Sequence, residues 1–144
     1  MTALSLSTVQ LDRICQQVLD EYPAEACGLF LGTLQNSGSD YVVEEIVPAT
    51  NILAHLSGRF EVDPKVRFLA EKRCRETGRQ VIGHWHSHPD TVAQPSETDL
   101  SMAYEPNLVW MILSTDGKRI ASQNAFLPPQ KGGESFRQIV LQIT

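Results

Sequence analysis

Apolar residues recur at helical spacing in two segments of the chain. In the first segment, which follows the N-cap candidates Ser7 and Thr8 and ends at Pro23, the apolar positions are Val9, Leu11, Ile14, Cys15, Val18 and Leu19. In the second segment, Pro64 suits the first turn of a helix and Gly78 suits a left-handed C-cap. The pattern therefore predicts two longer helices, one before Pro23 and one between Pro64 and Gly78.

Runs of β-forming residues predict several strands. Residues 26–34 and 41–47 flank the turn-type sequence 35–40 and read as a hairpin, and residues 108–114 and 119–127 pair across the tight turn at Asp116 and Gly117. Residues 80–88 alternate as a strand, and we expect a short strand at 60–62. A loop at 128–133 precedes a last strand near 136–143, and Ser96 opens a short third helix that reaches about Tyr104.

These elements mix without a regular β-α-β alternation. The order favours the α+β class, a sandwich of mainly antiparallel β-sheet flanked by two longer helices and one short helix. The 144 residues, 42% of them hydrophobic, predict a single domain over residues 1–144. A chain of this size buries enough surface to fold without disulfides or a structural metal. A metal bound here is therefore expected to serve function.

The charge and the cysteine content limit which binding partners and which cellular compartment we expect for the protein. The chain has 12 basic and 17 acidic residues, and the basic run at 72–79 alternates with glutamates as a solvated helix face would, so we expect no nucleic acid partner. Three cysteines without a Cys-x-x-Cys pair fit a reducing compartment. The start of the chain lacks a signal-peptide pattern, and the longest apolar run, 108–113, is too short to cross a bilayer. We expect a cytoplasmic protein without a membrane partner.

The candidate chemistry lies between residues 84 and 99. Residues two apart on a strand project from one face, so His86 and His88 can aim ring nitrogens at one ion about 2 Å away. Asp99, eleven residues after His88, can complete a set of three ligands with an open position, which is typical of a catalytic metal. Taken singly, the histidines also fit a hydrogen-bonded strand and Ser96 with Asp99 fits a helix cap. The lower-ranked candidates are His84, Asp90 and Glu97.

The same residues resemble the signature of the JAMM (MPN) metalloprotease domain family. That signature is His-x-His-Pro, six residues, then Ser-x-x-Asp, with an upstream glutamate. His86 to Pro89, residues 90–95, and Ser96 to Asp99 match it at every position, which selects His86 over His84, and Glu25 within 23–28 matches the upstream glutamate. The resemblance implies the cytidine-deaminase-like MPN fold. It also implies zinc (Zn²⁺) on His86, His88 and Asp99, with Glu25 as general base and Ser96 steadying the oxyanion.

Within the family, residues 23–28, 95–99 and 105–115 resemble the small bacterial hydrolases that act on sulfur-carrier proteins. The resemblance implies hydrolysis after the C-terminal Gly-Gly tail of a ubiquitin-like sulfur carrier, with release of cysteine. It leaves open a deconjugating isopeptidase for ubiquitin-like proteins, and it admits a homodimer.

Other interpretations also remain open at this point. A non-heme iron oxygenase uses a similar ligand set, although its histidines are usually split around His-x-Asp. An inactive scaffold of the same fold would lack the ligands. Cys27, close to Glu25, is interpreted as a small buried residue rather than a nucleophile, and Trp85 as core. Phe60 and residues 57–59 lie where the family often builds its substrate groove.

Overall fold

A computed structural model describes residues 1–130 and 133–144, so part of the loop expected at 128–133 lies outside the described residues. The elements confirm the α+β class, with two longer helices and a short one. In chain order they are β1 (Ala3–Leu6), α1 (Thr8–Glu21), β2 (Cys27–Gln35), β3 (Asp40–Ala49), α2 (Pro64–Thr77), β4 (Gln80–Pro89), α3 (Glu97–Ser101), β5 (Val109–Thr115), β6 (Ile120–Leu127) and β7 (Arg137–Ile143).

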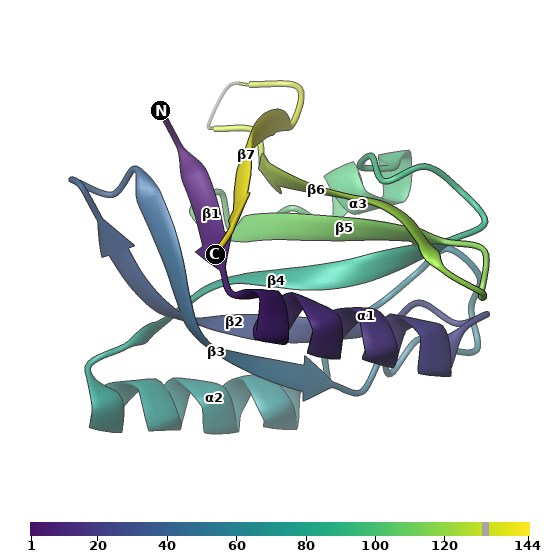
Figure 1. The fold of residues 1–144 in the computed structure, drawn as a ribbon, viewed down its shortest axis with the longest axis horizontal. Coiled ribbons are helices and arrows are strands. Elements are labelled where there is room, and N and C mark those ends of the chain that lie inside the picture. The colour runs from purple at the N-terminus through teal and green to yellow at the C-terminus, as the bar shows by residue number, and fades with distance from the viewer. Residues whose placement is uncertain (131–132) are drawn as a thin grey trace.

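The strands form one closed, mixed sheet in the order β1-β3-β2-β4-β5-β6-β7 (Figure 1). Among the described residues, four pairings are antiparallel and three are parallel, namely β1 with β3, β1 with β7 and β4 with β5. The expected sandwich is therefore a barrel, because the short strand β1 pairs with both β3 and β7 and joins the two ends of the sheet. The strand expected at 60–62 is reduced to one bridge between Asn51 and Val62.

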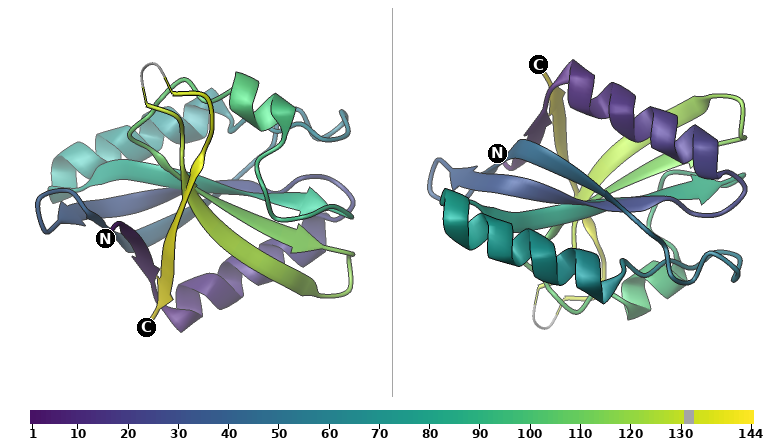
Figure 2. Two further views of the ribbon diagram at one scale, coloured as in Figure 1. Left: turned by 90° about the horizontal axis from the view of Figure 1, so that it is seen from above. Right: turned by 90° about the horizontal axis from the view of Figure 1, so that it is seen from below.

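The two long helices cover opposite faces of the region around β2 and β4 (Figure 2). Phe30 and Trp85 are fully buried in the core cluster that includes Ile14 and Val18 of α1. Leu29 and Leu31, which alternate with Phe30, pack instead with Ala70 and Cys74 of α2. Alternation along a strand thus sends neighbouring residues to different helices.

The ends of the long helices follow their sequence signals. Ser7 caps α1 in a reciprocal capping box with Gln10, and Gly78 ends α2 in the left-handed conformation at φ 70°. The third helix ends at Ser101, short of the expected Tyr104, because its C-cap, Met102, already leaves the helix.

Two arginines of the basic run are paired with glutamates of a neighbouring strand. Arg79 forms an ion pair with Glu44 of β3 at 2.7 Å, and Arg73 forms one with Glu45 of the same strand at 2.8 Å.

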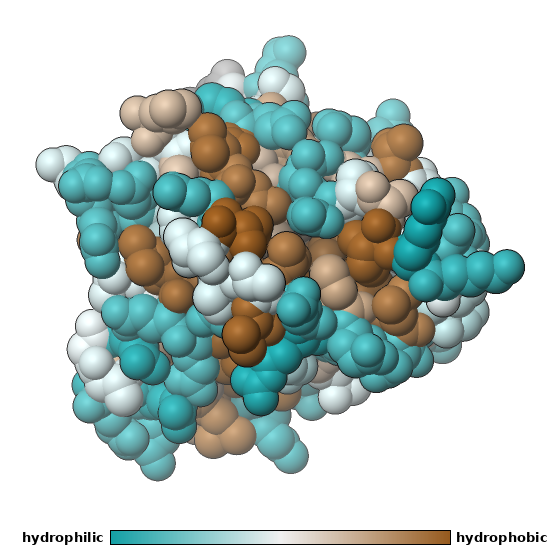
Figure 3. All heavy atoms as spheres, viewed as in Figure 1, coloured by the Kyte–Doolittle hydropathy of each residue, from teal (hydrophilic) through white to brown (hydrophobic). Residues whose placement is uncertain are grey.

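On the face of Figure 1, apolar residues gather over the middle and hydrophilic residues surround them (Figure 3). None of the helices in the described part of the chain has the length and apolar character needed to cross a membrane.

Candidate metal centre

Strand β4 supplies two of the predicted ligands. Its alternation turns His84, His86 and His88 toward the side of α2 and α3, whereas Trp85 points into the core beneath α1. His86 is fully buried, and His88 is 5% exposed. Two buried imidazoles from one strand face thus lie side by side at the end of the strand.

The predicted ligand atoms converge. Nε2 of His86 and Nε2 of His88 lie 3.1 Å apart, and Oδ2 of Asp99 lies 3.3 Å from the first and 3.0 Å from the second. Tetrahedral ligands with bonds of about 2.0 to 2.1 Å are separated by about 3.3 Å. The three atoms therefore have the spacing that a bound divalent metal requires.

Neighbouring groups orient these ligands. The Nδ1–H of His88 donates to the carbonyl oxygen of Val92 at 2.8 Å, which leaves Nε2 to carry the lone pair when the ring is neutral. Asp99 accepts from the backbone N–H of Ser96 at 2.9 Å, and its own N–H donates to Ser96 Oγ at 3.0 Å. The capping box that begins α3 therefore also fixes the carboxylate of the site.

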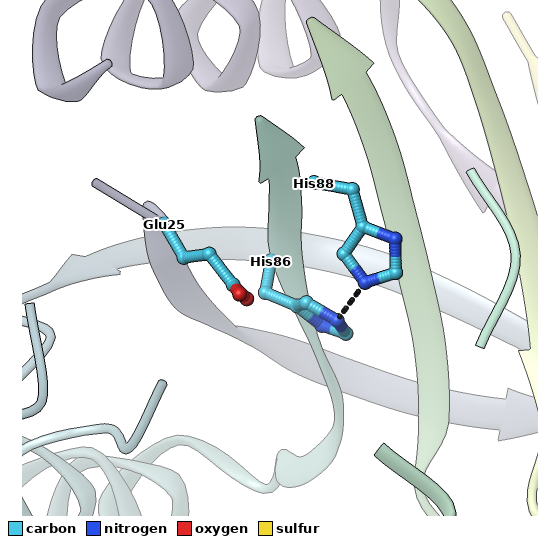
Figure 4. A group of neighbouring side chains, drawn as sticks. All are labelled: Glu25, His86 and His88. Carbon is cyan, nitrogen blue, oxygen red and sulfur yellow. Dashed lines mark hydrogen bonds between the residues drawn. The ribbon is translucent and has the colours of Figure 1, made fainter. Parts of the chain in front are cut away.

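Glu25 lies at the same place, just before β2. Its carboxylate points toward the histidines (Figure 4), and one atom from each of Glu25, His86 and His88 fits within a group in which all separations are at most 4.8 Å. The side chain is 5% exposed, and within the described residues its Oε1 has no hydrogen-bond partner. An unpaired buried carboxylate is costly unless it has a task or a bound ion.

Burial and mutual contact shift the pKa values of the cluster. Burial raises the pKa of Glu25 to about 7, with Asp99 adding to this effect and His88 opposing it. Burial opposes the charged form of Asp99, but hydrogen bonds from His86 and His88 hold the pKa of that carboxyl well below its usual range. Burial lowers the pKa of His86, which favours the neutral ring that binds a metal. The group could therefore hold a cation.

Most of the chain matches a known protein family. Residues 7–126 match the model of a family described as prokaryotic homologs of the JAB domain. The chain belongs to the JAB (JAMM/MPN) family. The predicted resemblance is thereby confirmed.

Three relatives of this JAB domain carry the names of enzymes. It is 28% identical to the desampylase of Haloferax volcanii over 121 residues, which is 84% of this chain and 79% of that protein. It is 29% identical over 131 residues, 91% and 78% of the two chains, to a probable TtuB-protein conjugate cleaving protease of Thermus thermophilus. It is 32% identical over 96 residues, 66% and 62% of the two chains, to a CysO-cysteine peptidase of Mycobacterium tuberculosis. These names confirm the prediction of a JAMM-type hydrolase.

Solved structures agree with the fold. A protein of Desulfitobacterium hafniense superposes with a TM-score of 0.81 at 29% identity, and the match covers 98% of this chain and 92% of that one. A JAB1/MPN domain protein of Archaeoglobus fulgidus has a TM-score of 0.59 at 21% identity, covering 100% and 99% of the two chains. The second likeness supports the fold alone.

The lower-ranked candidates of this JAB domain lie outside the cluster of ligand atoms. His84 packs its ring against Trp110, with centroids 4.5 Å apart, and lines a neighbouring cavity of about 340 Å³. Asp90 accepts from the hydroxyl of Tyr22, and Glu97 is exposed. Cys27 is buried, and burial raises the pKa of its thiol to about 12, which suits the interpretation as a small core residue.

Three further residues make contacts at the site that the sequence does not predict. Phe60 stacks on His86 with ring centroids 4.2 Å apart. Ser87, which is fully buried and stands between the two predicted ligand histidines in the sequence, accepts from the N–H of Ala26 at 2.8 Å. Asn51 is buried and donates to the carbonyl oxygen of Glu25 at 2.9 Å. Ser87 stands inside the motif, but only the fold shows what its hydroxyl contacts.

Proposed function

We propose that this protein is a zinc-dependent peptidase that hydrolyses the bond after the C-terminal Gly-Gly tail of a ubiquitin-like sulfur-carrier protein and releases cysteine. One observation carries the proposal. The candidate ligand atoms of His86, His88 and Asp99 converge beside the buried carboxylate of Glu25, whose Oε1 has no hydrogen-bond partner in the part of the chain that the structure describes.

The nature of the ion follows from the donor set. Two imidazole nitrogens and one carboxylate oxygen are a combination that zinc accepts, and three protein ligands leave a position open for water or substrate. When bound, zinc lowers the pKa of water and polarises a carbonyl group. We assign His86, His88 and Asp99 as the residues that hold it.

Glu25 serves as the general base and acid in this proposal. A carboxyl group with a pKa near 7 can take a proton from the attacking water and return it to the leaving amine at neutral pH. Glu25 lines a cavity of about 350 Å³ together with His88 and Ser96, so the base faces a space that can admit a peptide. Its backbone position just before β2 holds it beside the ligands rather than among solvent-exposed loops.

Ser96 has the second catalytic role. Its side-chain oxygen accepts from the N–H of Asp99 at 3.0 Å, which leaves the hydroxyl hydrogen free to donate. The same residue lines the cavity that holds Glu25. We assign its hydroxyl to stabilise the negative charge that develops on the carbonyl oxygen of the scissile bond.

The substrate class rests on the relatives. Two of their names describe cleavage, of TtuB-protein conjugates and of CysO-cysteine. A ubiquitin-like deconjugating isopeptidase is the second candidate, because one of these names refers to protein conjugates rather than to cysteine. We infer a cytoplasmic location from the three free cysteines.

The test uses the zinc-loaded protein with three substrates. These are a sulfur carrier extended by cysteine after Gly-Gly, an isopeptide conjugate of the same carrier, and a ubiquitin dimer. We expect release of cysteine from the first, with loss of cleavage in Glu25→Gln and retention in Glu97→Gln, an exposed glutamate two residues from Asp99. Cleavage of the conjugate alone supports the second candidate, and no cleavage of any substrate contradicts both.

A further inference from the structure

The carboxamide of Asn51 connects two parts of the site. Asn51 is 4% exposed, and its Nδ2 donates to the carbonyl oxygens of Glu25 at 2.9 Å and Arg59 at 3.1 Å. Its Oδ1 accepts from the N–H of Leu53 at 2.9 Å and from the N–H of Glu61 at 3.0 Å. Two donors and two acceptor positions are the full capacity of an amide side chain. No other side-chain type reproduces this set at this size.

Glu25 needs this contact because the hydrogen-bond ladder between β2 and β3 does not extend as far as Glu25. The pairing of β2 with β3 stops at Cys27 and Ala49, two residues after Glu25. On the other side, Ala26 exchanges hydrogen bonds with Ser87 of β4. The side chain of Asn51 therefore takes the place of the missing β3 partner and holds the Glu25 carbonyl.

The other half of the carboxamide closes the loop over residues 51–61. Leu53 and Glu61 donate to the same oxygen, and Ile52 donates to the carbonyl of Glu61 at 3.0 Å. This loop carries Phe60, whose ring stacks on His86. One buried side chain thus fixes both the backbone of the carboxylate and the loop that covers a metal-ligand ring.

We propose that Asn51 is a positioning residue for hydrolysis, which acts by holding Glu25 in place over the metal ligands. It touches neither the ligand atoms nor the cavity that Glu25 lines. The inference rests on the proposed role of Glu25 as general base. A displacement of about 1 Å in a catalytic group can cost on the order of 100-fold in rate, so the loss of this anchor is expected to be visible in kcat.

Asn51→Asp separates the two halves of the contact. The side chain keeps its shape and can still accept from Leu53 and Glu61, but it no longer donates to Glu25 and Arg59. We expect kcat on the substrate cleaved by the parent protein to fall by at least about 10-fold, with KM within about 3-fold and zinc content unchanged. Amide exchange at Leu53 and Glu61 is expected to stay slow in Asn51→Asp and to accelerate in Asn51→Ala.

Three controls separate positioning from a general loss of structure. Asn107→Asp makes the same change at an exposed site and should retain parental kcat. In the Glu25→Gln background, Asn51→Asp should add almost no further loss, because the residue through which it acts is already disabled. If circular dichroism shows that Asn51→Asp does not fold, Asn51→Ser, which also lacks the amide donors, is measured instead. The expectation is the same, a fall in kcat with KM nearly unchanged.

The outcomes distinguish this inference from the proposed function. An active parent with an equally active Asn51→Asp overturns the inference alone. Losses that multiply in the Glu25→Gln background also overturn it, since Asn51 then acts independently of Glu25. A parent that cleaves none of the substrates overturns the proposed function, and with it the role assigned to Asn51.

Discussion

The ring of Phe60 stacks on the ring of His86, with centroids 4.2 Å apart and planes inclined by 15°. Phe60 comes from the loop before α2, whereas His86 lies on β4. The edge of Trp110 approaches the same imidazole at a centroid distance of 5.4 Å. Two aromatic rings thus pack against the imidazole of one proposed ligand.

Removal of the Phe60 ring is expected to weaken metal binding. Groups that orient a ligand typically contribute about 10- to 100-fold to metal affinity, so Phe60→Ala should raise the dissociation constant for zinc by at least about 10-fold. Competition with a chromophoric chelator measures this change. Phe60→Tyr retains the ring and should bind zinc as the parent does. If Phe60→Ala also binds zinc with the affinity of the parent, the proposed role of the stack is contradicted.

The hydroxyl of Ser87 is expected to stabilise the fold at the site. It is the acceptor for the buried N–H of Ala26, and an alanine leaves that donor unpaired, which costs about 1 to 3 kcal/mol. Urea unfolding of the metal-free protein should therefore show that loss for Ser87→Ala. Ser122→Ala, at an exposed position of β6, serves as the control. Equal stability of the two variants would show that the Ala26 contact carries no weight.

The pKa of Glu25 predicts a pH dependence of stability in the metal-free protein. Burial raises that pKa from 4.5 to about 7, so between these values the folded chain binds more protons than the unfolded chain and stability falls as pH rises. Glu25→Gln removes this loss. It should be more stable than the parent by about 3 kcal/mol at pH 8 and by less than about 1 kcal/mol at pH 5, as measured by chemical unfolding. A difference that is the same at both pH values contradicts the burial of a charged carboxylate.

The sequence predicts the long helices and most strands because their signals are local. Ser7 and Gly78 act within one turn of their helices, and the turn at Asp116 joins adjacent strands. Strand β1 has only four residues and pairs with β7 from the far end of the chain, so no local pattern marks it. Closure of the barrel depends on that pairing, so local patterns do not predict it either.

The candidate metal ligands can also be predicted from local spacing in the sequence. His86, His88 and Asp99 lie within fourteen residues, in a pattern that a strand and a helix cap make meaningful. Asn51 belongs to no such pattern, because its contact with Glu25 spans 26 residues and depends on where β3 ends. The supporting contacts of the site therefore become visible only in the folded chain.

The zinc content and the cleavage rate of Glu25→Gln, measured on one preparation, test the central claim most directly. If Glu25 is the general base and His86, His88 and Asp99 are the ligands, this variant binds one zinc per chain, as the parent does. Its cleavage of the carrier substrate is then at least about 100-fold slower. A variant that has lost its zinc, or that cleaves at the parental rate, contradicts the account.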